Sequence, residues 1–127
     1  MTPGDFPKTF ATLFAARDSV GLALLLTDNA QVVTLTSGAA DNREAARALF
    51  EQEYAGTFAT ARLVTGKGRT QPIGPGAVVL HQNYVVTGAR DSAGQPLPRF
   101  AALVTVVLIA VSGGWLAVSL SLSALTQ

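Results

Sequence analysis

His81 is the only histidine in the chain, and imidazole is the side chain that most readily exchanges a proton near neutral pH. It lies in the segment Val79–Tyr84, whose pattern is typical of a β-strand. In a strand, His81 and Asn83 share one face, so an imidazole and an amide together can hold and polarise a ligand carbonyl. We therefore take His81 as the catalytic candidate. The alternative is a hydrogen-bonded histidine on a half-buried sheet or at an interface.

The carboxylates are concentrated in the first half of the chain, where helix caps and turns account for most of them. Seven of the 8 acidic residues lie at or before Glu53, and the last, Asp91, lies in a polar loop. Glu51 and Glu53 are expected on the solvated side of a helix. Asp28 is expected in a turn, with a functional position near the rim of a cavity as the alternative. Because the later strands carry no acid, they are not predicted to supply a catalytic carboxylate.

A basic cluster, Arg62, Lys67 and Arg69, lies in a stretch without acidic residues. Lysine and arginine commonly protect a sheet edge from aggregation, so a solvated strand edge is the simplest interpretation. A site for phosphate or carboxylate is the alternative. The sequence Gly66-Lys67-Gly68 lacks the rest of a phosphate-binding loop, so no nucleotide site is predicted.

Composition excludes several kinds of chemistry and of partner. The chain of 127 residues has no cysteine, which rules out disulfides, thiolate metal sites and cysteine nucleophiles. A single histidine rules out a multi-histidine metal centre, and a net charge of +1 lacks the basic footprint of a nucleic-acid-binding protein. We expect no metal, no cofactor and no nucleic-acid partner. With 49% hydrophobic residues, residues 1–127 are predicted to form a single packed domain.

The most apolar segment, residues 100–125, carries no charge. Ser112-Gly113-Gly114 interrupts it, and its second half alternates with a period of two. Because a membrane-spanning helix needs about 20 continuous apolar residues, a β-hairpin explains the segment better. The N-terminus lacks the basic-then-apolar order of a signal peptide. We therefore expect no membrane partner and, by default, a cytoplasmic location.

Periodicity predicts the elements that position these side chains. Helical spacing and capping residues predict three helices, at residues 6–17, at 20–26 and, after a capping box formed by Asp41 and Glu44, up to Gly56. Turn-forming residues predict a turn at 27–29 and a loop at 88–98. Alternation and apolar runs predict strands at 31–36, 58–65, 69–73, 77–87, 99–111 and 115–123. Helices followed by long antiparallel strands indicate an α+β fold with helices packed on one face of a sheet.

Several local phrases, in this order, resemble the NTF2-like superfamily, also called cystatin-like or SnoaL-like. They are Leu24–Ala30 before a strand, Asn42–Ala46 at the start of the third helix, Ala77–His81 leading to Tyr84–Gly88, and Gly113–Trp115 at the start of the last strand. The pattern is most similar to the small bacterial SgcJ/EcaC and DUF4440-type proteins. The resemblance covers nearly the whole chain.

The resemblance implies a cone, in which a curved antiparallel, mixed sheet wraps around about three N-terminal helices and leaves a pocket for a small apolar molecule. The superfamily includes isomerases, dehydratases and cyclases as well as non-catalytic assembly domains, so the fold alone does not decide the function. Many relatives end the last strand in a cavity histidine, where Ser121 stands here. The missing histidine argues against the acid–base role that this position carries in those relatives. The absence of acids from the later strands argues against a ketosteroid-isomerase-type mechanism.

Two functions remain. In the first, the chain binds a small apolar ligand and can also act on it as an isomerase-, dehydratase- or cyclase-type enzyme. The cavity for this ligand is predicted to be lined by Tyr54, His81, Asn83, Trp115, Ser119 and Ser121. In the second, it is a non-catalytic dimerisation or accessory domain whose cavity is filled by its own side chains. A cavity of about 300 Å³ or more with converging polar groups favours the first function, and a packed interior favours the second.

Strand parity predicts a homodimer through the outer face of the sheet. Trp115 and the serines that follow it share one parity. The other parity carries four aliphatic side chains, Leu116, Val118, Leu120 and Leu122. If the Trp115 face is turned into the cone, these four are left outside. At roughly 25 cal/mol per Å², leaving such a patch in water forgoes several kcal/mol, so a twofold contact is expected to cover it.

Overall fold

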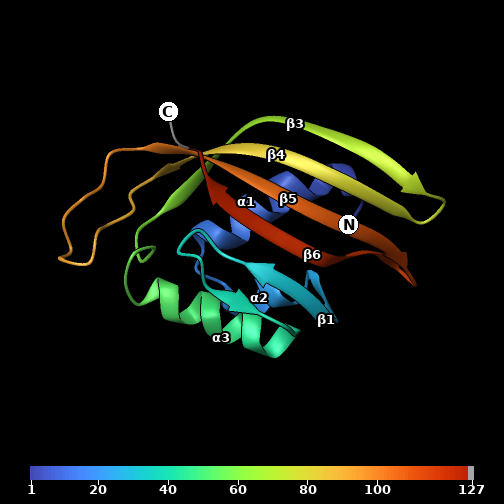
Figure 1. The fold of residues 1–127 in the computed structure, drawn as a ribbon, viewed down its shortest axis with the longest axis horizontal. Helices are drawn as coiled ribbons and strands as arrows, with labels where there is room; N and C mark the ends of the chain where they lie inside the picture. The colour runs from blue at the N-terminus through green and yellow to red at the C-terminus, as the bar shows by residue number, and fades with distance from the viewer. Residues whose placement is uncertain (126–127) are drawn as a thin grey trace.

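The computed structural model describes residues 1–125, which form one curved six-stranded sheet with the helices on one side of it (Figure 1). The strand order is β2-β1-β6-β5-β4-β3; β1 runs parallel to β6, and the other neighbours are antiparallel. The α+β class and the curved, mixed sheet are therefore confirmed. The elements are the 3-10 helix η1 (Pro3–Asp5), α1 (Phe6–Ala15), α2 (Ser19–Ala23), β1 (Leu26–Val33), β2 (Ala39–Ala40), α3 (Arg43–Tyr54), β3 (Arg62–Gly74), β4 (Ala77–Thr87), β5 (Phe100–Val111) and β6 (Gly114–Ala124).

Helix α1 is anchored by buried phenylalanines at i, i+4 spacing, namely Phe6, Phe10 and Phe14. The helix ends at Ala15, two residues before the predicted end, because Arg17 adopts a left-handed backbone conformation with φ 55°. Asp18 then begins α2, since its carboxylate accepts a hydrogen bond of 2.8 Å from the backbone N–H of Gly21. The two helices therefore follow each other across a sharp turn.

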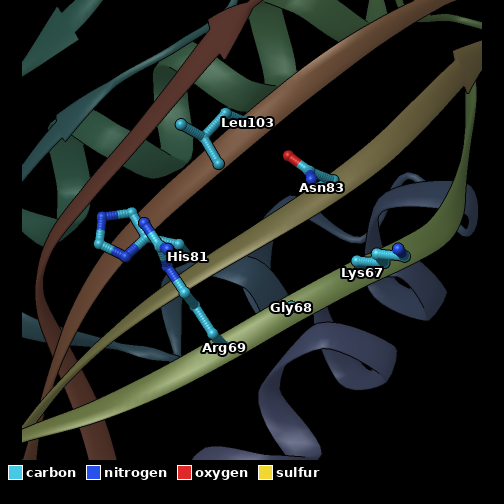
Figure 2. A pocket seen from close by; sticks show the side chains of 6 residues that line it. All are labelled: Lys67, Gly68, Arg69, His81, Asn83 and Leu103. Atoms are coloured by element: carbon cyan, nitrogen blue, oxygen red, sulfur yellow. The ribbon is translucent and has the colours of Figure 1, made fainter.

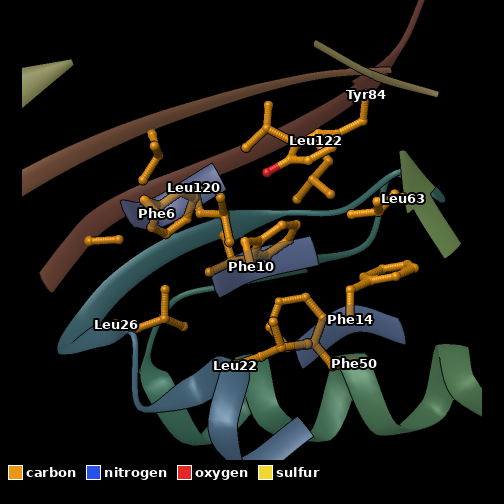
Figure 3. Packing of buried hydrophobic residues seen from close by; sticks show 14 of the residues in the cluster. Phe6, Phe10, Phe14, Leu22, Leu26, Phe50, Leu63, Tyr84, Leu120 and Leu122 are labelled. Atoms are coloured by element: carbon orange, nitrogen blue, oxygen red, sulfur yellow. The ribbon is translucent and has the colours of Figure 1, made fainter. Parts of the chain in front are cut away.

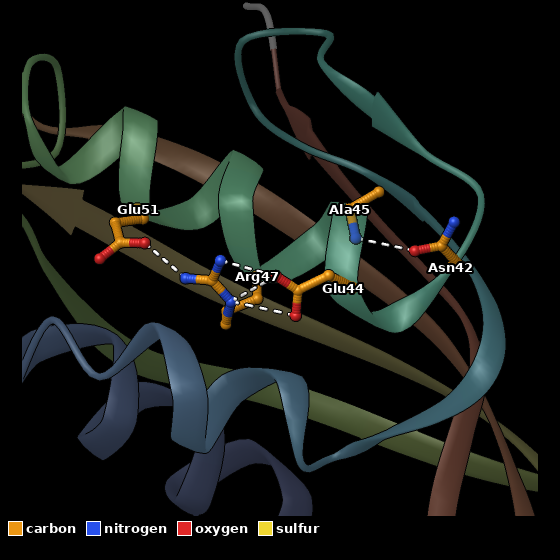
Figure 4. A network of polar contacts seen from close by, with 5 residues as sticks. All are labelled: Asn42, Glu44, Ala45, Arg47 and Glu51. Carbon is orange, nitrogen blue, oxygen red and sulfur yellow. Dashed lines mark hydrogen bonds and ion pairs between the residues drawn. The ribbon is translucent and has the colours of Figure 1, made fainter.

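The cap of α3 lies one residue away from the predicted position. Asn42, not Asp41, accepts a hydrogen bond of 2.8 Å from the backbone N–H of Ala45 (Figure 4). The Glu44 carboxylate turns along the helix to Arg47, whose guanidinium hydrogen-bonds to it and lowers the pKa of Glu44. The predicted capping box is therefore wrong, and these charges form a surface network instead.

The predicted boundaries of the first strands are wrong for local reasons. β1 begins at Leu26, so residues 27–29 belong to an irregular strand beside β6 and not to a turn. The chain turns at 34–38 instead, where Ser37 has φ 65°, and this turn adds the short β2. β3 is one strand where two were predicted, because Gly66-Lys67 forms a bulge and not a turn. The later strands, β4 to β6, match their predictions to within one residue.

The space between the helices and the sheet is filled by aromatic and aliphatic side chains (Figure 3). The rings of Phe6 and Phe10 stack with centroids 5.5 Å apart, and Phe10 lies 6.2 Å from the ring of Tyr84 on β4. The Tyr84 hydroxyl donates a hydrogen bond of 2.7 Å to the backbone carbonyl of Pro7. The chain's own residues therefore occupy the interior in which the resemblance implied a pocket.

A bulge in β6 reverses the strand parity on which the outer face was predicted. Ala117 lies opposite Leu108, but Ser119 lies opposite Val107, so Val118 is an extra residue. Trp115 therefore packs against the core, whereas the serines face outward. Of the leucines predicted to lie outside, Leu116 does so. Leu120 and Leu122 are instead buried, at 2% and 4% exposure.

Candidate functional site

The structure divides the six predicted ligand-binding residues between the two faces of the sheet. His81 and Asn83 on β4, with Ser119 and Ser121 on β6, face away from the helices. Tyr54 and Trp115 lie on the helix side, packed against the hydrophobic core. The expected cavity that combines all six is therefore wrong. His81, Thr105 and Ser121 are aligned across three neighbouring strands.

The interior tyrosines are structural donors. Tyr54 donates a hydrogen bond of 2.9 Å to the backbone carbonyl of Phe14, and the two rings meet edge to face at 5.5 Å. Burial raises the pKa of Tyr54, with a smaller contribution from the Glu53 carboxylate, and burial alone raises the pKa of Tyr84. Both phenols therefore stay neutral near pH 7, and neither serves as a base there.

Two acids also lie differently from their predictions. Glu53 was expected on the solvated side of its helix, but its carboxylate accepts hydrogen bonds from Thr34 at 2.6 Å and Thr36 at 2.7 Å. These bonds tie the turn after β1 to α3. Asp28, the predicted rim residue, pairs with Arg43 at 2.9 Å, and its side chain is 94% exposed. Asp28 therefore belongs to a surface ion pair.

An open hollow of about 490 Å³ lies on the outer face of the sheet, across β3, β4 and β5 (Figure 2). Its lining consists of Lys67, Gly68, Arg69, His81, Asn83 and Leu103. Two members of the predicted basic cluster therefore meet the predicted histidine–asparagine pair. Figure 2 shows the Arg69 side chain reaching from β3 toward the His81 ring, its register partner on β4.

A residue that the sequence analysis did not select, Gln82, holds the β3 side of this hollow in place. Its side-chain amide donates hydrogen bonds to three backbone carbonyls, those of Gly66 at 2.8 Å, Lys67 at 3.2 Å and Asn83 at 3.0 Å. Gln82 is only 3% exposed, so these bonds also satisfy a buried polar group. The sequence feature that indicates this role is a lone glutamine on the apolar face of β4, opposite a glycine-rich stretch of β3.

Electrostatically, the hollow is cationic. Among residues 1–125, neither Lys67 nor Arg69 takes part in an ion pair; the pairs involve Arg43 and Arg47. Within the part of the chain that the structure describes, no acidic residue lines the hollow. The arrangement can therefore attract an anion, and two cations beside an imidazole without a carboxylate give no basis for a metal site. Within the described part of the chain, no group of three His, Cys, Asp or Glu side chains is placed to hold a metal ion.

Comparisons with known proteins place the fold. The sequence matches no protein-family model and no curated protein. Among solved structures, an uncharacterised protein with a cystatin-like fold from Caulobacter vibrioides superposes with a TM-score of 0.87 at 11% identity, over 97% of this chain and 87% of that one. A protein of the NTF2-like family from Streptomyces avermitilis, provisionally assigned as a dehydratase, gives 0.79 at 15% identity, over 98% and 94%.

The chain has the NTF2-like, cystatin-like fold. The resemblance seen in the sequence is thus confirmed at the level of fold, and the SgcJ/EcaC and DUF4440 subgroup is not specifically indicated. A third neighbour, from Xanthomonas campestris, is provisionally assigned as a calcium/calmodulin-dependent protein kinase II association domain. It superposes with a TM-score of 0.81 at 18% identity, over 98% of this chain and 86% of that one.

In this fold, the hollow and the space between the helices and the sheet are on opposite faces of the sheet. The inner face of β4 carries Leu80, Gln82 and Tyr84, and its outer face carries His81 and Asn83. The only histidine therefore lies away from the filled interior. No helix formed by residues 1–125 is long and apolar enough to cross a membrane.

Proposed function

We propose that this chain is a non-catalytic assembly domain that forms a homodimer through the outer face of its sheet. The observation that carries the proposal is the contrast between the two faces. The inner face is closed by the chain's own helices, with Phe6 and Phe10 fully buried. Among residues 1–125, no layer covers the outer face, which still presents aliphatic side chains. An antiparallel sheet that faces water normally carries polar residues there.

The contact surface of the proposed dimer is an outer apolar patch near the two hairpin turns. In the register of the sheet, Val79 lies beside Val107, and Ile109 lies beside Leu116. All four are partly exposed in one copy. A twofold axis covers the same patch on both copies at once, which makes a second copy the simplest complementary partner.

The free energy gained by covering the outer apolar patch is large enough for a dimer contact. Covering the remaining exposed area of such a side chain is worth about 1 kcal/mol, so eight of them across a twofold axis contribute about 8 kcal/mol before the entropic cost of association. The near-neutral net charge of +1 opposes association of two copies only weakly. The neighbour provisionally assigned as an association domain supports an assembly role for this fold.

Light scattering at a chain concentration of tens of micromolar tests the proposal. The wild-type chain is expected to show twice the chain mass of 13.1 kDa, and Val107→Lys is expected to show the single mass with an unchanged circular dichroism spectrum. Leu24→Lys is the matched control, because Leu24 is a 62% exposed aliphatic residue on the helix side. A monomeric wild type, or a dimeric Val107→Lys variant, contradicts the proposal. Leu120 is not a suitable position, since its side chain belongs to the core.

A second candidate function, the binding of a small molecule, is supported by the hollow and not by the interior. Its volume of about 490 Å³ exceeds the roughly 300 Å³ expected of ligand sites, and polar side chains line it. Dehydratase-, isomerase- or cyclase-type catalysis has no comparable support, because His81 faces away from the filled interior and no carboxylate lines its hollow.

A further inference from the structure

We propose that the hollow formed by Lys67, Arg69, His81, Asn83 and Leu103 binds the oxyanion group, carboxylate or phosphate, of a small and partly apolar organic acid. This site goes beyond the proposed assembly function and does not depend on it. The hollow is open to solvent on the outer face of the sheet, so a ligand reaches it without any movement of the helices.

The charge of the site selects an anion. Lys67 and Arg69 bring two cationic groups to one side of the hollow, and no ion pair within residues 1–125 neutralises either of them. A guanidinium presents parallel N–H groups that match the two oxygens of a carboxylate or phosphate, and a lysine adds a point charge. The acidic residues of the chain lie on the helices, on β1 and in loops, away from this part of the sheet.

Further hydrogen-bonding groups complete the site. Neither the His81 ring nor the side-chain amide of Asn83 makes a hydrogen bond to another residue in the described part of the chain, so both are available to a ligand. Leu103 lies beside Asn83 on the neighbouring strand and gives the hollow an apolar wall. Donors next to an aliphatic surface suit a ligand that has an anionic head and a hydrocarbon body.

The β3 bulge orders the cationic side of the site. The Gln82 amide is bonded to the carbonyls of Gly66 and Lys67, so the backbone from which the Lys67 side chain projects is fixed from the opposite face. Protection of an edge strand explains exposed basic residues in β3 such as Arg62. It does not explain why two of them line one hollow together with a histidine and an asparagine.

The site and the outer apolar patch adjoin but do not coincide. Arg69, His81 and Asn83 lie toward the middle of their strands, whereas the patch lies near the hairpin turns at residues 74–76 and 112–114. The two proposals can therefore fail separately. Measuring ligand binding on both the wild-type chain and Val107→Lys shows whether occupancy of the hollow depends on the state of assembly.

Titration calorimetry with three probes tests the site: benzoate, phenyl phosphate and the neutral isostere benzamide. At least one anion is expected to bind saturably with a millimolar dissociation constant, and benzamide is expected to bind at least tenfold more weakly. Saturation by benzoate alone identifies a carboxylate site, and saturation by phenyl phosphate alone identifies a phosphate site. Equal affinities for benzamide and the anions overturn the proposal, as does the absence of saturation up to about 20 mM of every probe.

Charge-removal variants locate the site on the chain. The double variant Lys67→Gln/Arg69→Gln is expected to lose about tenfold or more in affinity for the anionic probe. Arg62→Gln is the matched control, because Arg62 is an exposed arginine of the same strand outside the hollow. Circular dichroism confirms that each variant is folded. An equal loss in Arg62→Gln, or an unchanged affinity in the double variant, assigns the binding to general surface charge and refutes the site.

Discussion

Replacing Gly68 by alanine is expected to destabilise the chain because the new methyl group occupies the space of the Gln82 side chain. A Cβ built at residue 68 overlaps the Gln82 side-chain oxygen and lies 2.9 Å from its Cδ. The backbone at this position is not in the left-handed region, so alanine is conformationally allowed there. The cost therefore arises from the displaced amide and not from backbone strain.

The size of the expected loss in unfolding free energy follows from the hydrogen bonds of the Gln82 side-chain amide. Its nitrogen serves three carbonyls, at 2.8, 3.0 and 3.2 Å, in a side chain that is 3% exposed. Each such bond contributes about 0.5–1.5 kcal/mol net, and a buried amide left without partners costs more. The longest of the three is weak because one amide is shared. We therefore expect Gly68→Ala to lower the free energy of unfolding by about 2–3 kcal/mol.

Urea unfolding at a fixed chain concentration, followed by the fluorescence of the single tryptophan, Trp115, measures this loss. At a slope of about 2 kcal/mol per M, the midpoint is expected to fall by about 1 M. Gln82→Ala alone is expected to cost a similar amount, because the same hydrogen bonds are lost. In the double variant there is no amide left to displace, so the second substitution is expected to cost less than about 0.5 kcal/mol.

This non-additivity is the decisive result. If the two single losses simply add in the double variant, the contact between residues 68 and 82 is not the cause of the glycine requirement. A loss below about 0.5 kcal/mol for Gly68→Ala alone likewise refutes the reasoning, since it means that the amide moves aside without losing its partners. Gly74→Ala is the control in the same strand, because a Cβ there meets no atom within 4 Å.

Three further predictions concern the core and the caps. Phe10→Ala is expected to cost about 3–5 kcal/mol in urea unfolding, because it removes a fully buried ring from the aromatic stack. Tyr84→Phe is expected to cost about 0.5–1.5 kcal/mol, because it removes the hydrogen bond from the phenol to the Pro7 carbonyl. Since burial raises the folded-state pKa of Tyr84, wild-type stability is complete below pH about 10 and falls above it, with a smaller slope in the variant. Asn42→Ala is expected to lower the thermal midpoint through a loss of about 1 kcal/mol, and Asp41→Ala is expected to leave it nearly unchanged.

The order of elements was predictable because each long segment carries a strong repeating pattern. The stripe of phenylalanines predicts α1, and the apolar runs predict β4 to β6 to within one residue. These patterns reflect burial on one face, which sequence periodicity records directly. Their order, together with the local phrases quoted above, carried the resemblance to the NTF2-like superfamily, and that resemblance implied the fold.

The boundaries and caps were less predictable because competing partners decide them. Asp41 and Asn42 are both good caps, and only the path of the backbone selects Asn42. Glu53 has the spacing of a solvated residue, yet two threonine hydroxyls from the turn after β1 reach it. Such contacts join residues 17 and 19 positions apart, which periodicity within one helix does not register.

Two bulges decide which side chains lie on each face of the sheet. They explain why the candidate site lies on the outer face and not on the predicted inner face. Strict alternation places Trp115 and Ser121 together, but the extra residue at Val118 separates them. In β3, the bulge at Gly66-Lys67 changes which residues lie beside Asn83 and brings Lys67 to its hollow. A bulge adds one residue and exchanges the faces of everything beyond it, so a single missed bulge inverts a predicted surface. The residue types were therefore informative about chemistry, and the backbone irregularities decided where that chemistry is presented.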